Sequence, residues 1–252
     1  MENMTRKRFG LNSNVLKLIA AAAMLTDHIG YKFWAQLPVA AVYACRGVGR
    51  IAMPIYCFML VEGLFHTRDI KKYLLRLAVF AVVSEVPFDL MIFDRVIDWK
   101  HQNVIITLTL SLCCAAAVKL IEERTKNAAL RWLLTALVIA AGCEVCVLAR
   151  TDYSAVGVMM VFAFYFGRKN KLVTVLLLVF SNVILDAALF GADNLWFKYL
   201  MAPEFLSLFA LVPIFLYNGE RGRVSPVSRY GFYVFYPAHM LAIYGVNVLI
   251  WL

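Results

Sequence analysis

Charged side chains are scarce in this chain, and their scarcity excludes most classes of soluble protein. Asp, Glu, Lys and Arg make up 16% of the 252 residues, whereas 63% are apolar and the mean hydropathy is +0.75. Soluble domains carry roughly 25% charged residues. The composition therefore predicts an integral membrane protein. Since no polar linker or low-complexity tract interrupts it, we expect one domain over residues 1–252.

Three further features narrow the class of protein. The net charge of +9 comes from short basic clusters between apolar runs, which orient membrane proteins, so nucleic acid is not an expected partner. The first apolar run is too long for a signal-peptide core and lacks a clear cleavage site, so we expect it to be retained. Cys143 and Cys146 form a C-x-x-C without a second pair or a nearby histidine. We expect packing cysteines and no metal.

Apolar runs of about 20 residues predict an all-α bundle of nine transmembrane helices in a multi-pass protein of the plasma membrane. The expected spans are residues 14–36, 46–65, 73–93, 103–121, 131–149, 155–167, 172–190, 203–217 and 230–251.

Basic residues predict the orientation of these spans. One side of the bundle receives five clusters, and the other side receives few positive charges, several of them beside an acid. The clusters are Arg6, Lys7 and Arg8; Arg68, Lys71 and Lys72; Arg124, Lys126 and Arg131; Arg168, Lys169 and Lys171; and Arg221, Arg223 and Arg229. The positive-inside rule then places the N-terminus in the cytoplasm and, with nine spans, the C-terminus outside.

The first span carries Lys17, Asp27 and His28, which are unusual in lipid. Lys17 and His28 are eleven positions apart, about 20° around a helix and about 16 Å along it, so both can line one inward stripe. That stripe predicts a site rather than an anchor. Asp27 points about 100° away from His28, a direction that suits pairing with an arginine. His239, near the middle of the last span, is a second candidate site residue.

Charged residues in the outer half of the bundle predict a polar chamber. Arg46 and Arg50 are one helical turn apart, and Glu85 and Asp89 share a face of the third span. One interpretation is structural: the two acids pair with Arg46 or Arg50 and hold the second and third spans together. The other is that these four residues bind an acceptor substrate. The two interpretations are compatible.

The cytoplasmic end of the third span is basic. Arg68, Lys72 and Arg76 are spaced by four and share one helix face, with Lys71 beside them. Such a cluster either contacts anionic lipid as a topology signal or binds a phosphorylated ligand. A basic cluster inside, a polar stripe across the bilayer and an acidic chamber outside together favour transfer of a group across the membrane.

Several runs of the sequence resemble the TraX family, whose namesake acetylates the N-terminus of a conjugative pilin. The runs are LKLIAAAAMLTDHIGY, GRIAMPIYCFMLVEGLFHTRDIKKYLLRLAVFAVVSEVPFDL, NVIITLTL, DYSAVGV and FYVFYPAHML. The family is in turn similar to acyltransferase 3 enzymes, in which a basic residue, ten positions and a catalytic histidine mark the first helix. Lys17 and His28 match that spacing, but the R-x-x-R motif of those enzymes is absent here.

This resemblance implies a membrane acyltransferase that takes an acetyl group from cytoplasmic acetyl-CoA. The acceptor would be a peptide amine or a glycan hydroxyl or amine outside the membrane. His28 would be the general base or would carry the acyl group. The implied catalytic set is His28, Asp27, His239 and Tyr153. The implied acetyl-CoA set is Lys17, Arg68, Lys71, Lys72, Arg76 and Asn103. Asn103, Tyr153 and Tyr236 are candidates to hydrogen-bond the thioester oxygen or to orient the histidine. Arg46, Arg50, Glu85 and Asp89 form the implied acceptor site.

The competing interpretation is a membrane protein without catalytic activity, either a transporter or an assembly scaffold for an exported polymer or pilus. Transporters commonly have helices broken at matching positions of two halves, and the prolines show no such pairing. A scaffold would not require Lys17 and His28 on one stripe.

Overall fold

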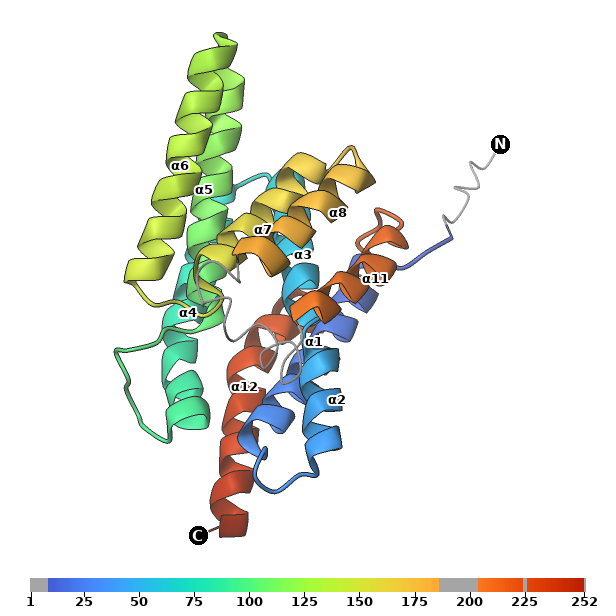
Figure 1. Cartoon of the computed structure of the whole chain (residues 1–252), viewed down its shortest axis with the longest axis vertical. Helices are drawn as coiled ribbons and strands as arrows, with labels where there is room; N and C mark the ends of the chain where they lie inside the picture. Colours follow the sequence, from blue (N-terminus) through green and yellow to red (C-terminus); the bar gives the residue numbers. More distant parts are fainter. Residues whose placement is uncertain (1–8, 186–203, 224–225, 252) are drawn as a thin grey trace.

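The computed structural model is a bundle of α-helices (Figure 1). It describes residues 9–185, 204–223 and 226–251, without the side chains of residues 183–185, 226–230 and 251. Within those ranges there is no β-strand, only the isolated bridges Leu11–Tyr217 and Gln102–Thr151. The helices are α1 (Ser13–Lys32), α2 (Val39–Gly49), α3 (Ala52–His66), α4 (Ile70–Phe93), α5 (Val104–Arg124), α6 (Ala128–Leu148), α7 (Ser154–Gly167), α8 (Lys171–Val179), the π-helix η1 (Phe180–Leu185), the 3-10 helix η3 (Glu204–Ala210), α11 (Leu211–Phe215) and α12 (Pro226–Trp251).

Asparagine and aspartate side chains set where most of the long helices begin. Each of these residues accepts a hydrogen bond from a backbone N–H of the first helical turn, which has no partner within the helix. They are Asn12 of α1, Asp69 of α4, Asn103 of α5, Asn127 of α6 and Asn170 of α8.

Each of the nine predicted segments contains helix within its described residues, and the second differs most from expectation. Its helix begins at Val39, not at residue 46, and is interrupted at Arg50 and Ile51, which separate α2 from α3. Asp186, Arg6, Lys7 and Arg8 lie outside the described residues. Four of the described helical segments are long and apolar enough to cross a membrane: Val39–His66, Val104–Arg124, Ala128–Leu148 and Gly231–Ile250.

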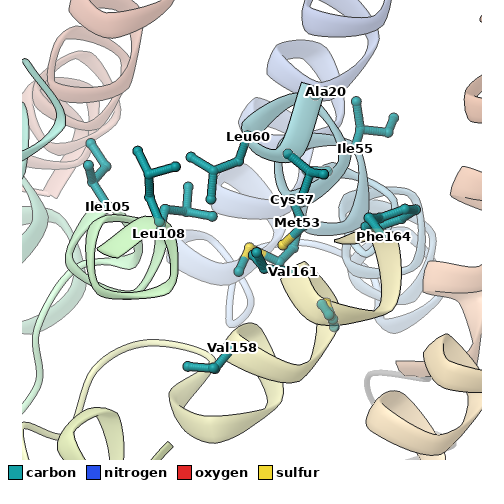
Figure 2. Close-up of a cluster of buried hydrophobic side chains, with 14 of the residues drawn as sticks. Ala20, Met53, Ile55, Cys57, Leu60, Ile105, Leu108, Val158, Val161 and Phe164 are labelled. Carbon is teal, nitrogen blue, oxygen red and sulfur yellow. The ribbon is translucent and has the colours of Figure 1, made fainter. Parts of the chain in front are cut away.

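Helix α7 lies at the centre of the bundle and α6 at its edge. Eleven of the fourteen residues of α7 are buried, whereas α6 buries three of twenty-one. The core in Figure 2 joins α7 to α3 and α5 through Met53, Leu60, Leu108, Val161 and Phe164. Conversely, Leu133, Leu137 and Leu148 leave an apolar face of α6 exposed, as expected of a helix that contacts lipid.

Helices α1 and α12 pack side by side and run in the same direction. Lys17 lies over the ring of Phe232, His28 contacts His239, and Lys32 lies over the ring of Tyr244. Residue numbers rise together in these three pairs, so the two helices are parallel. The parallel packing aligns the Lys17–His28 stripe with one face of α12.

The loops separate by charge along the bundle. Those joining α3 to α4, α5 to α6 and α7 to α8 lie in the upper half of Figure 1 and contain or adjoin three of the basic clusters. The loops after α1 and after α4 and the end of α12 lie in the lower half. The lower loop at 33–38 has no charged residue, and that at 94–103 carries Asp94 and Asp98 with Arg95 and Lys100.

Candidate functional site

The centre of the candidate site is a pair of histidines from the two parallel helices. His28 Nδ1 lies 2.7 Å from His239 Nε2. The ring planes are within 4° of parallel and the centroids are 5.0 Å apart. Because the nitrogens are much closer than the centroids, the rings meet edge to edge in a hydrogen bond. The structure thus joins two histidines that are 211 positions apart.

His239 is held firmly by its own helix. It is 5% exposed, and its Nδ1 lies 2.8 Å from the carbonyl oxygen of Phe235, one turn earlier in α12. The ring of Phe235 is parallel to the His239 ring, and the ring of Tyr236 meets it nearly at right angles. These contacts leave His239 little freedom to turn.

Asp27 is ion-paired with arginine, in the direction predicted from the helix geometry. Arg46 Nη1 donates to Asp27 Oδ2 at 2.7 Å, and Arg50 Nη2 lies 3.6 Å from Asp27 Oδ1. Gly49, between the two arginines, packs directly against the Asp27 side chain. The carboxylate next to His28 in sequence therefore links α1 to α2, and among the described residues it forms no hydrogen bond or ion pair with either histidine.

Arg50 joins this ion cluster to two other parts of the fold. Its Nη1 donates to Glu204 Oε1 at 3.0 Å and to the Tyr153 hydroxyl at 3.4 Å. The side chain is 7% exposed. Its Nε and Nη2, together with Asp27 Oδ1, are buried without a hydrogen-bond partner in the structure. Nη2 and Oδ1 face each other across the ion pair, so Arg50 Nε is the donor that remains available to a polar ligand.

Tyr153 reaches Arg50 from a strained connection between α6 and α7. Arg150, Tyr153 and Ser154 have φ angles of 51°, 60° and 42°. Such angles are uncommon for residues with a side chain and cost about 1–3 kcal/mol each. The connection is held by hydrogen bonds to the loop before α5: Gln102 N–H donates to the Arg150 carbonyl and Asp152 N–H to the Gln102 carbonyl.

The same two loops bring His101 to Asp152. His101 Nε2 lies 3.7 Å from Asp152 Oδ1. This contact with the carboxylate raises the pKa of His101 above its usual value, against the opposing effect of partial burial. His101 was not among the candidate residues of the sequence, and the structure gives it a role in joining the loops.

Glu85 and Asp89 do not pair with Arg46 or Arg50, so that structural prediction was wrong. Glu85 accepts hydrogen bonds from the backbone and side-chain N–H groups of Asn103, and Asp89 accepts from the backbone N–H of Asp98 at 2.7 Å. The reason is topological: both carboxylates face the loop that follows their own helix, whereas the arginines face α1 and η3.

Asn103 is fully occupied by structural contacts. Its Oδ1 accepts from Ile105 N–H at 2.9 Å, and its Nδ2 donates to the carbonyl of Ala81 and to Glu85. Both amide hydrogens are therefore used. These contacts favour a helix-capping role over the predicted bond to a thioester.

The other predicted acetyl-CoA residues lie toward the opposite end of the bundle from Asn103. Lys17 Nζ is 5.7 Å from the centroid of Phe232, and the nearby charge that acts on it is that of Arg221. Arg76 lies over the ring of Tyr73 and contacts Tyr233. Lys72 is exposed and lies 3.4 Å from Asp69. Arg68 and Lys71 stand beside it at the start of α4. Lys17 and Arg76 thus flank the same part of α12.

Sequence reasoning missed Glu204 as a site residue. The available signal was one of charge: Arg46 and Arg50 need carboxylate partners, and the acids assigned to them were Glu85 and Asp89, which bind elsewhere. Elsewhere, a cavity of about 160 Å³ is lined by Glu122, Arg131, Trp132 and Thr135 and includes none of the predicted site residues. Among the described residues, no cluster of three or more His, Cys, Asp or Glu side chains could hold a metal ion.

The fold and the site define a class: an all-helical protein with helices long enough to cross a membrane and a buried polar site of histidines, arginines and acids. Comparison with known proteins then gives the family. The chain belongs to the TraX family, whose model matches residues 12–247.

Two relatives illustrate this similarity. The chain is 32% identical over 237 residues to the "Probable fimbrial assembly protein FimC, serogroup H1" of Dichelobacter nodosus, a match that covers 89% of this chain and 91% of that protein. It is 27% identical over 100 residues to the "Uncharacterized protein RP591" of Rickettsia prowazekii, covering 40% of this chain and 35% of the relative. No solved structure gives a significant match.

Proposed function

We propose that this protein is an acyl-CoA-dependent acetyltransferase of the plasma membrane, with His28 as its catalytic centre. The observation that carries the proposal is the His28–His239 hydrogen bond beside the Asp27–Arg46–Arg50 cluster. A half-buried, oriented imidazole next to an available hydrogen-bond donor is a combination that suits general-base chemistry on a carbonyl.

The orientation follows from the charges of the loops. The basic ends face the cytoplasm, and the nine predicted segments cross or enter the membrane, with the N-terminus inside. Lys17 and Arg76 then lie on the cytoplasmic side, and His28 lies in the outer half. Acetyl-CoA would dock its phosphates near Lys17, Arg68, Lys71, Lys72 and Arg76 and extend its thioester along α12 toward His28.

The reaction balances with these groups. An acceptor hydroxyl or amine, entering from outside, attacks the acetyl carbonyl while His28 removes its proton. The new bond joins the acceptor heteroatom to the acetyl carbon, and the bond between that carbon and sulfur breaks. The proton passes from His28 to the departing thiolate, which leaves as CoA. The guanidinium of Arg50, whose buried Nε has no hydrogen-bond partner in the structure, is the group that would stabilise the oxyanion.

Radiolabelled acetyl-CoA and purified protein in detergent test this proposal. We expect slow hydrolysis of the donor, or labelling of an added amine or glycan acceptor, and a 10²–10⁴-fold loss in the His28→Ala variant. His66→Ala is the matched control, because His66 is an exposed histidine at the end of α3. Unchanged turnover in folded His28→Ala would contradict the catalytic assignment.

A second candidate is a scaffold for pilus assembly without catalytic activity, favoured by the name of the Dichelobacter relative. The same variant separates the two functions in cells. If the protein acts as a scaffold, pili assemble normally with His28→Ala. If it acts as an acetyltransferase, mass spectrometry of exported pilins and envelope polymers shows the loss of one acetyl group.

A further inference from the structure

We propose that His239 is a positioning residue that holds His28 in one tautomer, with the proton on Nδ1, and so makes Nε2 the basic atom of the site. The tautomer itself is a property of the folded protein. Its catalytic meaning rests on the proposed acetyltransferase function.

The argument begins at the Phe235 carbonyl. A carbonyl oxygen only accepts hydrogen bonds, so the nitrogen 2.8 Å from it, His239 Nδ1, must carry a hydrogen. A neutral imidazole has one N–H, so the other nitrogen of His239, Nε2, has a lone pair and accepts. His239 Nε2 faces His28 Nδ1 at 2.7 Å. His28 Nδ1 must therefore donate.

The same logic assigns the last nitrogen. With its single hydrogen on Nδ1, neutral His28 has a lone pair on Nε2. No hydrogen bond to His28 Nε2 is present among the described residues. That atom is the one able to take a proton from an acceptor hydroxyl or amine. The two consecutive hydrogen bonds, from His28 to His239 and from His239 to the Phe235 carbonyl, thus orient His28 and set its tautomer. In many histidine sites a carboxylate has this role.

The surroundings explain why a histidine orients His28 here. Asp27, the nearest acid in sequence, is engaged by Arg46 and Arg50, and Glu204 is engaged by Arg50. The rings of Phe235 and Tyr236 cover His239, which fixes its plane. His239 does not need to touch the substrate to act: it sets the direction and the tautomer of His28.

Nitrogen NMR of the histidine rings tests the proposal without any assay of activity. The chain has four histidines, so protein labelled with ¹⁵N only at histidine gives few signals, each assignable with a His→Gln variant. We expect a directly bonded hydrogen on His28 Nδ1 and on His239 Nδ1, and no hydrogen on His28 Nε2. A hydrogen on His28 Nε2 in the unmodified protein would overturn the proposal.

Two substitutions sharpen this test. His239→Leu removes the acceptor, so the population of His28 protonated at Nδ1 falls. His239→Gln keeps an acceptor oxygen, so more of the His28 population should stay protonated at Nδ1 than in His239→Leu. His66→Gln is the matched control, because His66 Nδ1 makes the same one-turn contact with the Glu62 carbonyl at 2.8 Å but does not touch His28. An unchanged His28 spectrum in His239→Leu would also overturn the proposal.

These outcomes separate the proposal from the function on which its meaning rests. The expected tautomer in a protein without acetyl transfer supports the positioning role and contradicts the enzyme. Acetyl transfer with the hydrogen on His28 Nε2 supports the enzyme and contradicts the positioning role.

Discussion

Asp27 of α1 and Arg46 of α2 form an ion pair of 2.7 Å in which the two side chains are only 15% and 21% exposed. The pair links α1, which carries His28, to α2, which ends directly before Arg50. Because Arg50 also reaches Glu204 and Tyr153, four segments of the chain meet around one guanidinium. The site is thus built from segments that are distant in sequence.

A double-mutant cycle measures this ion pair. Breaking a largely buried pair from one side leaves an uncompensated charge, so we expect Asp27→Asn and Arg46→Gln each to lower the free energy of unfolding by about 3 kcal/mol. The double variant should lose less than the sum, by about 2 kcal/mol. Thermal unfolding in detergent supplies the measurement.

The ion pair between Lys32 and Asp94 is the control for that cycle. Its nitrogen and oxygen are 2.6 Å apart, but Asp94 is 60% exposed. Asp94→Asn should cost less than about 1 kcal/mol, since exposed pairs contribute little. If Asp27→Asn and Asp94→Asn lowered the free energy of unfolding equally, burial would not make the Asp27 ion pair more stabilising than the exposed one.

Close packing of Gly49 against Asp27 supports a second prediction. A Cβ at residue 49 would overlap the Asp27 carboxylate and its Cβ, so the ion pair would have to shift. Gly49→Ala should lower the free energy of unfolding by about 1–3 kcal/mol. Gly245→Ala in α12 is the matched control: a Cβ there meets no atom within 4 Å, so that variant should unfold no more easily. Equal stability of both variants would count against close packing at Gly49.

The sequence predicted which residues share a helix face better than it predicted which residues of different helices contact each other. Helical periodicity correctly gave the shared stripe of Lys17 and His28 and turned Asp27 toward an arginine. It did not identify His239 as the partner of His28, or Glu204 as the partner of Arg50, because such pairs depend on how distant helices pack. It also began the second helix at residue 46, since Arg46 and Arg50 were interpreted as a helix end. Their pairing with Asp27 and Glu204 lets the helical segment extend to Val39.

Contact between His101 and Asp152 makes the junction between the loop before α5 and the loop before α7 sensitive to pH. The pKa of His101 is raised in the folded protein, so folding favours its protonated form. This stabilisation is complete below the unfolded pKa of about 6.5 and is lost as the pH rises through the higher folded value. Because both side chains are more than a third exposed, the effect should stay below about 1 kcal/mol.

Thermal unfolding across neutral pH checks this expectation. In His101→Gln and in Asp152→Asn, the decline of Tm with rising pH should be shallower than in the unmodified protein. A decline of the same steepness in both variants would assign the pH dependence to other groups.

Lys17 should affect the binding of the donor without affecting the chemical step. It lies on the stripe of His28 but about 16 Å along the helix from it, which is too far for contact with the reacting carbonyl. Its ammonium lies over Phe232, and the charge that acts on it is the like charge of Arg221. Two adjacent cations favour a phosphate. Lys17→Met should therefore raise the KM for acetyl-CoA about tenfold and leave kcat within about twofold, the pattern of lost uniform binding.

Lys119→Met is the matched control, because Lys119 Nζ lies 5.2 Å from the ring centroid of Phe65 in the same kind of contact, on helices that do not carry the histidine pair. A fall in kcat without a change in KM would place Lys17 in the chemical step, and equal effects of the two variants would assign both to packing against an aromatic ring.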